Sequence, residues 1–254
     1  MTTAMQNATE EIRGGKMKVV DLTHPIDEHS PYWPEKVPGT PFRASTVATY
    51  QQDGCFTRNL VIPEHFGTHM DAPAHFDPKG DTIAQISAEK FLGPAVIIDV
   101  SGAAKSDADY RVRASDVQNW IELHGRIPLG ALVLIRTGWE ERWPSQARYM
   151  NTDSAGVMHF PGLSVEAARY LLDHTHPAGI GIDTASIDAG ASNGFPVHHL
   201  TLLAGLYHLE NVANLSQLPP KGFSIIALPL KLGGGSGSPA RVLALLPGEA
   251  SSPD

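Results

Sequence analysis

The sequence is poor in cysteine, in long hydrophobic runs and in positive charge. Cys55 is the single cysteine, which excludes an internal disulfide and is typical of a reducing compartment. No apolar run approaches the roughly 20 residues of a membrane span, which argues against an integral membrane protein. The 19 Lys and Arg against 27 Asp and Glu argue against nucleic acid or an anionic membrane as the main partner. We therefore expect a cytoplasmic protein.

The 254 residues are enough for one large domain with a sizeable core. Both ends are polar, so we expect a disordered leader over residues 1–16 and a disordered tail over 249–254. The segment between them, 17–248, shows neither an internal repeat nor a dividing linker, and we read it as one domain.

Apolar periodicity predicts strands and helices that alternate along the second half of the chain. Such alternation indicates an α/β core with a mixed sheet and flanking helices. The glycine run at 233–239 lies between two strands and opens no helix, so we expect a mobile loop there and no phosphate cradle. The expected strands cover 17–23, 42–50, 55–62, 94–100, 132–136, 179–183, 223–230 and 241–246, and the expected helices cover 115–124 and 164–174.

The richest chemistry lies between residues 64 and 76, where three histidines and an aspartate crowd together: His65, His69, Asp71 and His75. Imidazoles with a carboxylate suit a divalent transition metal. Gly67 and Pro73 disfavour a helix, so we predict a tight turn at Gly67 followed by an extended piece. His69 and Asp71 then point to the same side, and the turn brings His65 back to join them. The other reading is chance clustering among twelve histidines.

Two later residues have the chemistry of an acid/base pair beside a metal, His198 and Glu210. They are twelve residues apart, which would put them near one face if the interval were helical. From the residues alone this pairing is weak, because Glu210 is equally read as a surface carboxylate and His199 competes with His198. Trp33 lies in a proline-rich loop, which suits a pocket wall or an ordinary rigid connection equally well.

The run from His65 to His75 resembles the His-x-Gly-Thr-His-x-Asp-x-Pro-x-His signature of the cyclase-like metal hydrolases. That family includes isatin hydrolase and bacterial kynurenine formamidase. The resemblance extends over most of the chain, and it includes the segments 136–139, 181–184 and 195–198 and the Gly-Ser-Pro loop. It implies a swivelling β/β/α fold and a homodimer or dimer of dimers, in which a neighbouring subunit contributes to the active site.

The resemblance also implies roles for individual residues. It makes His65, His69 and Asp71 the ligands of one divalent ion, manganese or zinc, and His75 the general base that later protonates the leaving nitrogen. His198 and Glu210 resemble the family's distal pair, which either lies beside the ion or binds a second one. Trp33 and Phe195 are the expected substrate-binding residues.

The implied reaction is hydrolysis of the C–N bond of a small aromatic cyclic amide, isatin to isatinate. The segments 181–188 and 195–198 favour the isatin-hydrolase branch. The alternatives are N-formylkynurenine hydrolysis, a metal-dependent lyase of the same fold, and a binder without enzymatic activity.

Overall fold

The computed structural model describes residues 4–34 and 42–248 and is built around one large mixed sheet. Its eight strands run in the order β1, β12, β11, β5, β7, β9, β10, β4. Neighbours are parallel from β5 through β7 and β9 to β10 and antiparallel elsewhere. The bounds are β1 (Met17–Asp21), β4 (His69–Asp71), β5 (Leu92–Asp99), β7 (Leu132–Arg136), β9 (Gly179–Ile182), β10 (Tyr207–Glu210), β11 (Phe223–Pro229) and β12 (Gly237–Pro247).

The long strand β12 closes this sheet into a barrel-like ring. Its first residues pair with β4, with Gly237 opposite Asp71 and Pro239 opposite His69. Its later residues lie between β11 and β1. The Gly-Ser-Pro segment was expected to be a mobile loop, and that prediction is wrong for residues 237–239. Glycine and serine are small enough for the chain to lie flat against β4, which supplies the pairing partner.

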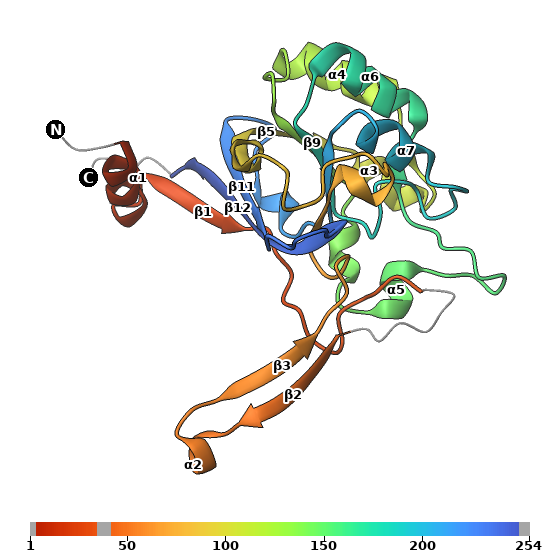
Figure 1. Ribbon diagram of the computed structural model, residues 1–254. Helices are drawn as coiled ribbons and strands as arrows, with labels where there is room; N and C mark the ends of the chain where they lie inside the picture. Colours follow the sequence, from red (N-terminus) through yellow and green to blue (C-terminus); the bar gives the residue numbers. More distant parts are fainter. Residues whose placement is uncertain (1–3, 35–41, 249–254) are drawn as a thin grey trace.

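Helices cover one face of the sheet, and a second core fills the inside of the ring. The central strands are apolar on both faces, as expected for buried parallel strands. In β5, Val96 and Ile98 pack toward the helices, whereas Ala95 and Ile97 pack inward. Figure 1 shows the helices grouped over the parallel strands. They are α3 (Ser101–Ser106), α4 (Ala114–His124), α6 (Val165–Thr175) and α7 (Pro196–Leu202).

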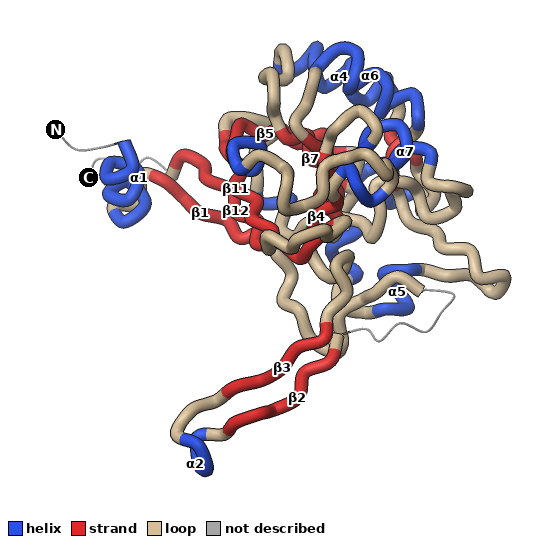
Figure 2. Tube along the Cα trace, in the orientation of Figure 1, coloured by secondary structure: helices blue, strands red, loops and turns tan. Residues whose placement is uncertain are grey.

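A two-stranded arm projects from the body, as the tube view shows (Figure 2). It consists of β2 (Arg43–Ala48) and β3 (Thr57–Val61), joined through the short helix α2 (Tyr50–Asp53). The strands expected at 42–50 and 55–62 are confirmed with shorter bounds, and they pair as a hairpin. Gly54, with φ of +73°, ends α2 before β3 begins.

The remaining elements are short and connect the larger ones. They are the helices α1 (Ala4–Arg13) and α5 (Gln146–Met150), the strands β6 (Arg111–Val112) and β8 (Gly162–Leu163), and the 3-10 turns η1 (Pro73–His75), η2 (Ala88–Phe91), η3 (Trp139–Arg142) and η4 (Leu215–Gln217).

The fold confirms the predicted single α/β domain with a mixed sheet and flanking helices. At its start the chain differs from expectation, because α1 occupies most of the predicted leader. The residues of α1, such as Ala4, Gln6 and Glu10, favour helix formation. The predicted tail, 249–254, lies outside the described residues. Within the described ranges, no helix is long and apolar enough to cross a membrane.

Candidate metal centre and active site

The histidine stretch forms a turn, a strand and a 3-10 turn in succession. Gly67 has φ of +63°, a conformation that favours glycine, and β4 starts two residues later. Because side chains alternate along a strand, His69 and Asp71 share one side of β4. β4 pairs with β10 on one side and with β12 on the other, so these two side chains project from a rigid support. The predicted turn and extended piece are confirmed.

Three predicted ligands meet at one carboxylate oxygen. Asp71 Oδ1 lies 2.7 Å from His65 Nδ1 and 3.2 Å from His69 Nε2. His69 and Asp71 are buried, and His65 is partly exposed toward the pocket. Gly237 makes room for this arrangement: a Cβ atom there would lie 2.5 Å from His65 Cε1. The structure thus brings His65, His69 and Asp71 together as the signature implied.

Hydrogen bonds on the far side of each ring assign which nitrogen carries the proton. The Ser236 hydroxyl donates to Glu64 and therefore accepts from His65 Nε2, which leaves Nδ1 unprotonated toward Asp71. His69 Nδ1 donates to the carbonyl oxygen of Gly67 at 2.9 Å, so its Nε2 lone pair points inward. With both rings neutral, two lone pairs would face one carboxylate oxygen at close range. Such a contact is repulsive unless a positive charge lies between the groups.

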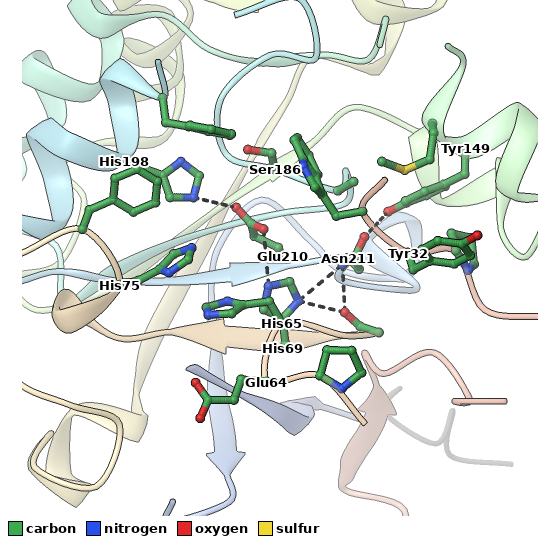
Figure 3. Close-up of a pocket in the computed structure, with 18 residues that line it drawn as sticks. Tyr32, Glu64, His65, His69, His75, Tyr149, Ser186, His198, Glu210 and Asn211 are labelled. Atoms are coloured by element: carbon green, nitrogen blue, oxygen red, sulfur yellow. Dashed lines mark hydrogen bonds and ion pairs between the residues drawn. The ribbon is translucent and has the colours of Figure 1, made fainter. Parts of the chain in front are cut away.

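The distal pair lies on the opposite wall of the same centre (Figure 3). Glu210 Oε1 is 3.2 Å from His198 Nε2, and Glu210 Oε2 is 3.4 Å from His69 Nε2. A continuous helix from His198 to Glu210, which would have explained their proximity, is not present. His198 lies in α7 and Glu210 in β10, with a turn between the two elements. Tertiary packing, not helical spacing, brings them together. His199, the competing residue, is exposed.

A second group of possible ligands shares Asp71 with the first. Asp71, His198, His208 and Glu210 are all buried, and they offer ligand atoms within 4.8 Å of one another. Among the described residues, neither Asp71 Oδ2 nor His208 Nδ1 has a hydrogen-bond partner. Unpaired buried polar atoms are costly, and a cation between them removes that cost. The donor set therefore fits one divalent ion and has the atoms to hold a second.

The pKa shifts show that this centre favours positive charge. Burial alone would lower the pKa of His69, but hydrogen bonds to Asp71 and Glu210 raise it to about 10. Burial and the nearby Asp71 would raise the pKa of Glu210, but His198 and His69 lower it to about 2. Despite burial, the nearby His65 holds the pKa of Asp71 well below its usual value. The carboxylates of Asp71 and Glu210 therefore remain ionised, as ligands of a metal ion must.

His75 has a different environment from these groups. Its ring stacks on His65 with centroids 3.9 Å apart, and it lines the pocket. Burial lowers the pKa of His75 to about 4, so the ring is neutral at neutral pH. A neutral imidazole can accept a proton, which is what a general base requires.

A cavity of about 340 Å³ opens beside the centre and is walled by aromatic and apolar side chains. Trp33 and Phe195 both line it, with ring centroids 5.8 Å apart. Phe76 lies between Phe195 and His198, at 5.6 and 4.8 Å. The cavity therefore offers aromatic surfaces to a ligand and has His69, His198 and Glu210 in its wall.

Comparison with known proteins decides the family. Residues 20–189 match the family profile described as "Putative cyclase". The chain belongs to the cyclase family. It is 33% identical to isatin hydrolase of Roseibium aggregatum over 96% of this chain and 97% of that protein. It is 31% identical to kynurenine formamidase of Geobacillus thermodenitrificans over 87% and 94%. The solved isatin hydrolase A of Ralstonia solanacearum superimposes with a TM-score of 0.91 at 36% identity, covering 97% of this chain and 98% of that one.

The structure of this cyclase-family member adds residues that the sequence analysis missed. His208 has a recognisable signal, because it precedes Glu210 by two positions in β10 and so shares its side of the strand. Asn211 donates to the carbonyl oxygen of Gly67 and accepts from the Tyr149 hydroxyl, each at 2.8 Å. Glu64 and Ser236, which orient His65, come from segments 172 positions apart, and no local pattern connects them.

Proposed function

We propose that this protein is a metal-dependent hydrolase that opens the amide ring of isatin to give isatinate. The observation that carries the proposal is the pair of imidazole nitrogens, His65 Nδ1 and His69 Nε2, that lie 2.7 and 3.2 Å from Asp71 Oδ1 beside an aromatic-lined cavity. The similarity to isatin hydrolases over nearly the whole chain supports this substrate.

In this proposal His65, His69 and Asp71 hold one divalent ion, manganese or zinc. When bound, such an ion polarises a carbonyl and lowers the pKa of water at the site. Nitrogen and oxygen ligands suit both metals, so elemental analysis of protein purified without added metal identifies which one is bound.

The chain's own residues then supply proton transfer. The neutral ring of His75 accepts a proton from the attacking water and returns it to the leaving ring nitrogen. His198 and Glu210 complete the opposite wall, where His198 Nε2 and the carboxylate oxygens of Glu210 face the reacting groups. These are the catalytic residues that we propose: His75, His198 and Glu210.

Trp33 and Phe195 are the proposed substrate-binding residues. Their rings stand 5.8 Å apart in the wall of the cavity, so each offers an apolar surface to a planar bicyclic substrate. A cavity of about 340 Å³ is large enough for a molecule of that size.

The second candidate function is kynurenine formamidase, which the relatives with that activity favour. Both substrates carry an amide on an aromatic ring, so the same centre suits either. The deciding experiment incubates metal-loaded protein with isatin and, separately, with N-formylkynurenine, and follows both by chromatography. Faster turnover of isatin is expected. Faster turnover of N-formylkynurenine would assign the formamidase instead, and turnover of neither would reject both.

A lyase is distinguished from a hydrolase by whether an oxygen atom from water enters the product. Hydrolysis in ¹⁸O-labelled water places one labelled oxygen in the product carboxylate, whereas elimination places none.

We also propose a homodimer or dimer of dimers in which the β2–β3 arm forms an interface. An isolated two-stranded hairpin is marginally stable, and every residue of β3 is exposed. Large apolar side chains lie bare along the arm, including Val47 at 59% and Leu60 at 54% exposure. Light scattering should show Leu60→Glu dissociating the assembly. Leu123→Glu, at an exposed position of α4, is the matched control and should not. A monomeric unmodified protein would reject the proposal.

A cytoplasmic location is proposed as well, supported by the single exposed cysteine, Cys55. Cell fractionation tests it directly.

A further inference from the structure

We propose that Asp188 is a positioning residue that holds His198 in one tautomer, with the proton on Nδ1 and the lone pair of Nε2 turned into the metal centre. This inference rests on the proposed function, because it assigns how one of the proposed catalytic residues is prepared. Asp188 lies outside the signature and outside both groups of possible metal ligands.

The carboxylate of Asp188 is buried and makes three contacts with the start of α7. Its Oδ1 accepts from the backbone N–H of Val197 at 3.0 Å. Its Oδ2 accepts from the backbone N–H of His198 at 3.0 Å and lies 2.7 Å from Nδ1 of the same residue. Asp188 itself is 1% exposed, so water does not compete for these positions.

These contacts leave one assignment of the proton. Both backbone groups are donors only, so Asp188 binds them as a carboxylate, which accepts hydrogen bonds and donates none. Its short contact with Nδ1 therefore requires a proton on Nδ1. In the neutral ring the lone pair is then on Nε2, which lies 3.2 Å from Glu210 Oε1 and 3.4 Å from Asp71 Oδ2.

The local sequence explains why the carboxylate of Asp188, and not a residue next to α7, accepts from the first N–H groups of this helix. The first turn of a helix has unpaired N–H groups, and a side chain just before the helix usually accepts from them. Here that position is Phe195, which has no acceptor, and Pro196 follows it. Asp188 accepts from Val197 and His198 instead. The same carboxylate thus fixes the start of α7 and the orientation of the His198 ring.

The consequence is that His198 can act only through Nε2. An Nε2 lone pair can accept a proton from a reacting group or bind a cation between Asp71 and Glu210. The other tautomer would place an N–H there, which would donate to Glu210 or Asp71 and block both actions. In serine proteases, the aspartate that holds the catalytic histidine acts in the same way, and its replacement by asparagine costs about 10⁴ in kcat.

The direct test is the tautomer itself, measured in the unmodified protein. We load ¹⁵N-histidine-labelled protein with diamagnetic zinc and record two- and three-bond nitrogen–hydrogen correlations, assigning His198 with the His198→Gln variant. A proton on Nδ1 alone is expected. A proton on Nε2, alone or together with one on Nδ1, would overturn the inference. This readout needs no turnover, so a protein that does not hydrolyse isatin would reject the proposed function and leave the tautomer result standing.

Kinetics separate positioning from simple support of the fold. Asp188→Asn should lower kcat for the turned-over amide by about 10²–10⁴ with little change in KM. In a His198→Gln background the same change should have no further effect, because Asp188 acts through His198. An equal additional loss in that background would show a structural role and overturn the inference, as would an unchanged kcat in the single variant.

Asp183→Asn is the matched control. Asp183 is another buried carboxylate that accepts backbone N–H groups, from Thr137, Gly138 and Trp139, but the structure gives it no contact with His198. Its replacement should lower the stability of the fold while the His198 tautomer stays the same. A changed tautomer in this control would show that the ring responds to general loosening of the fold, which would also overturn the inference.

Discussion

The histidines around Asp71 use different ring nitrogens, and hydrogen bonds outside the centre decide which. His65 presents Nδ1 because Ser236 accepts from its Nε2, whereas His69 presents Nε2 because Gly67 accepts from its Nδ1. Such outer contacts orient metal ligands and raise their basicity. The nitrogen that each imidazole presents to Asp71 therefore depends on Ser236 and Gly67, which contact the other nitrogen of each ring.

The first prediction concerns the three proposed ligands. His65→Ala, His69→Ala and Asp71→Ala should each lose bound metal and activity together, because each removes one of three donors. Metal content is measured by elemental analysis beside activity. His199→Ala is the matched control, since His199 is exposed and outside the centre, and it should keep its metal. A full complement of metal in any of the three variants would remove that residue from the ligand set.

The second prediction concerns His75. Its ring stacks on His65, but His75 belongs to neither group of possible ligands in the described part of the chain. His75→Ala should therefore keep most of the metal and lose roughly 10²–10⁴-fold in kcat, the usual loss for a general base. Metal titration and steady-state kinetics on the same sample check both parts. Complete loss of metal would make His75 a ligand instead.

At the scale of elements, the centre depends on how closely β12 approaches β4. Gly237 pairs with Asp71 across these strands, and its bare Cα faces the His65 ring. The strand pairing that closes the ring of the sheet therefore also sets the space available to a ligand.

The third prediction follows from this contact. In Gly237→Ala the new Cβ would lie 2.5 Å from His65 Cε1 and 2.7 Å from the Met70 carbonyl oxygen. We expect His65 to be displaced, metal affinity to fall about 10–100-fold, and stability to fall by about 1–3 kcal/mol. Calorimetric metal titration and urea unfolding measure these changes. Gly233→Ala, where an added Cβ meets open space, should change neither. An unchanged metal affinity in Gly237→Ala would contradict this prediction, because it would show that the neighbouring strand shifts to accommodate the new Cβ atom.

At the scale of the whole molecule, the half-buried His24 couples stability to pH. His24 stacks on Trp143 with ring centroids 4.2 Å apart, and burial lowers its pKa to about 4 from the ordinary value of 6.5. Between these pH values the unfolded chain binds a proton that the folded protein does not. The stabilising contribution of neutral His24 is therefore complete above pH 6.5 and is lost as pH falls toward 4.

The fourth prediction tests this coupling. The free energy of unfolding should fall by roughly 1–3 kcal/mol more between pH 6.5 and 4 in the unmodified protein than in His24→Phe. Phenylalanine keeps a ring against Trp143 but cannot take up a proton. Urea titrations at a series of pH values measure the difference. Parallel pH profiles for the two proteins would mean that His24 is protonated equally in the folded and unfolded states.

Local patterns in the sequence determined much of this protein. The central strands were predictable because both faces of each are buried, so each reads as an apolar run, and β5, β7 and β9 were found within a few residues of their bounds. The ligands on β4 were predictable because the alternation of a strand places His69 and Asp71 on one side. The apolar runs and the side-chain alternation each extend over only a few residues. Within one strand, the spacing of residues in the sequence determines their spacing in the structure.

Only the tertiary structure decided what lies across from β4. His198 and Glu210 meet because α7 packs beside β10, although a helix does not join them. Asp188 contacts His198 from the other side of a loop, and Ser236 contacts His65 from 171 positions away. The Gly-Ser-Pro segment becomes a strand because β4 offers an edge to pair with. These contacts depend on strand order and closure of the sheet, and no short-range periodicity carries that information.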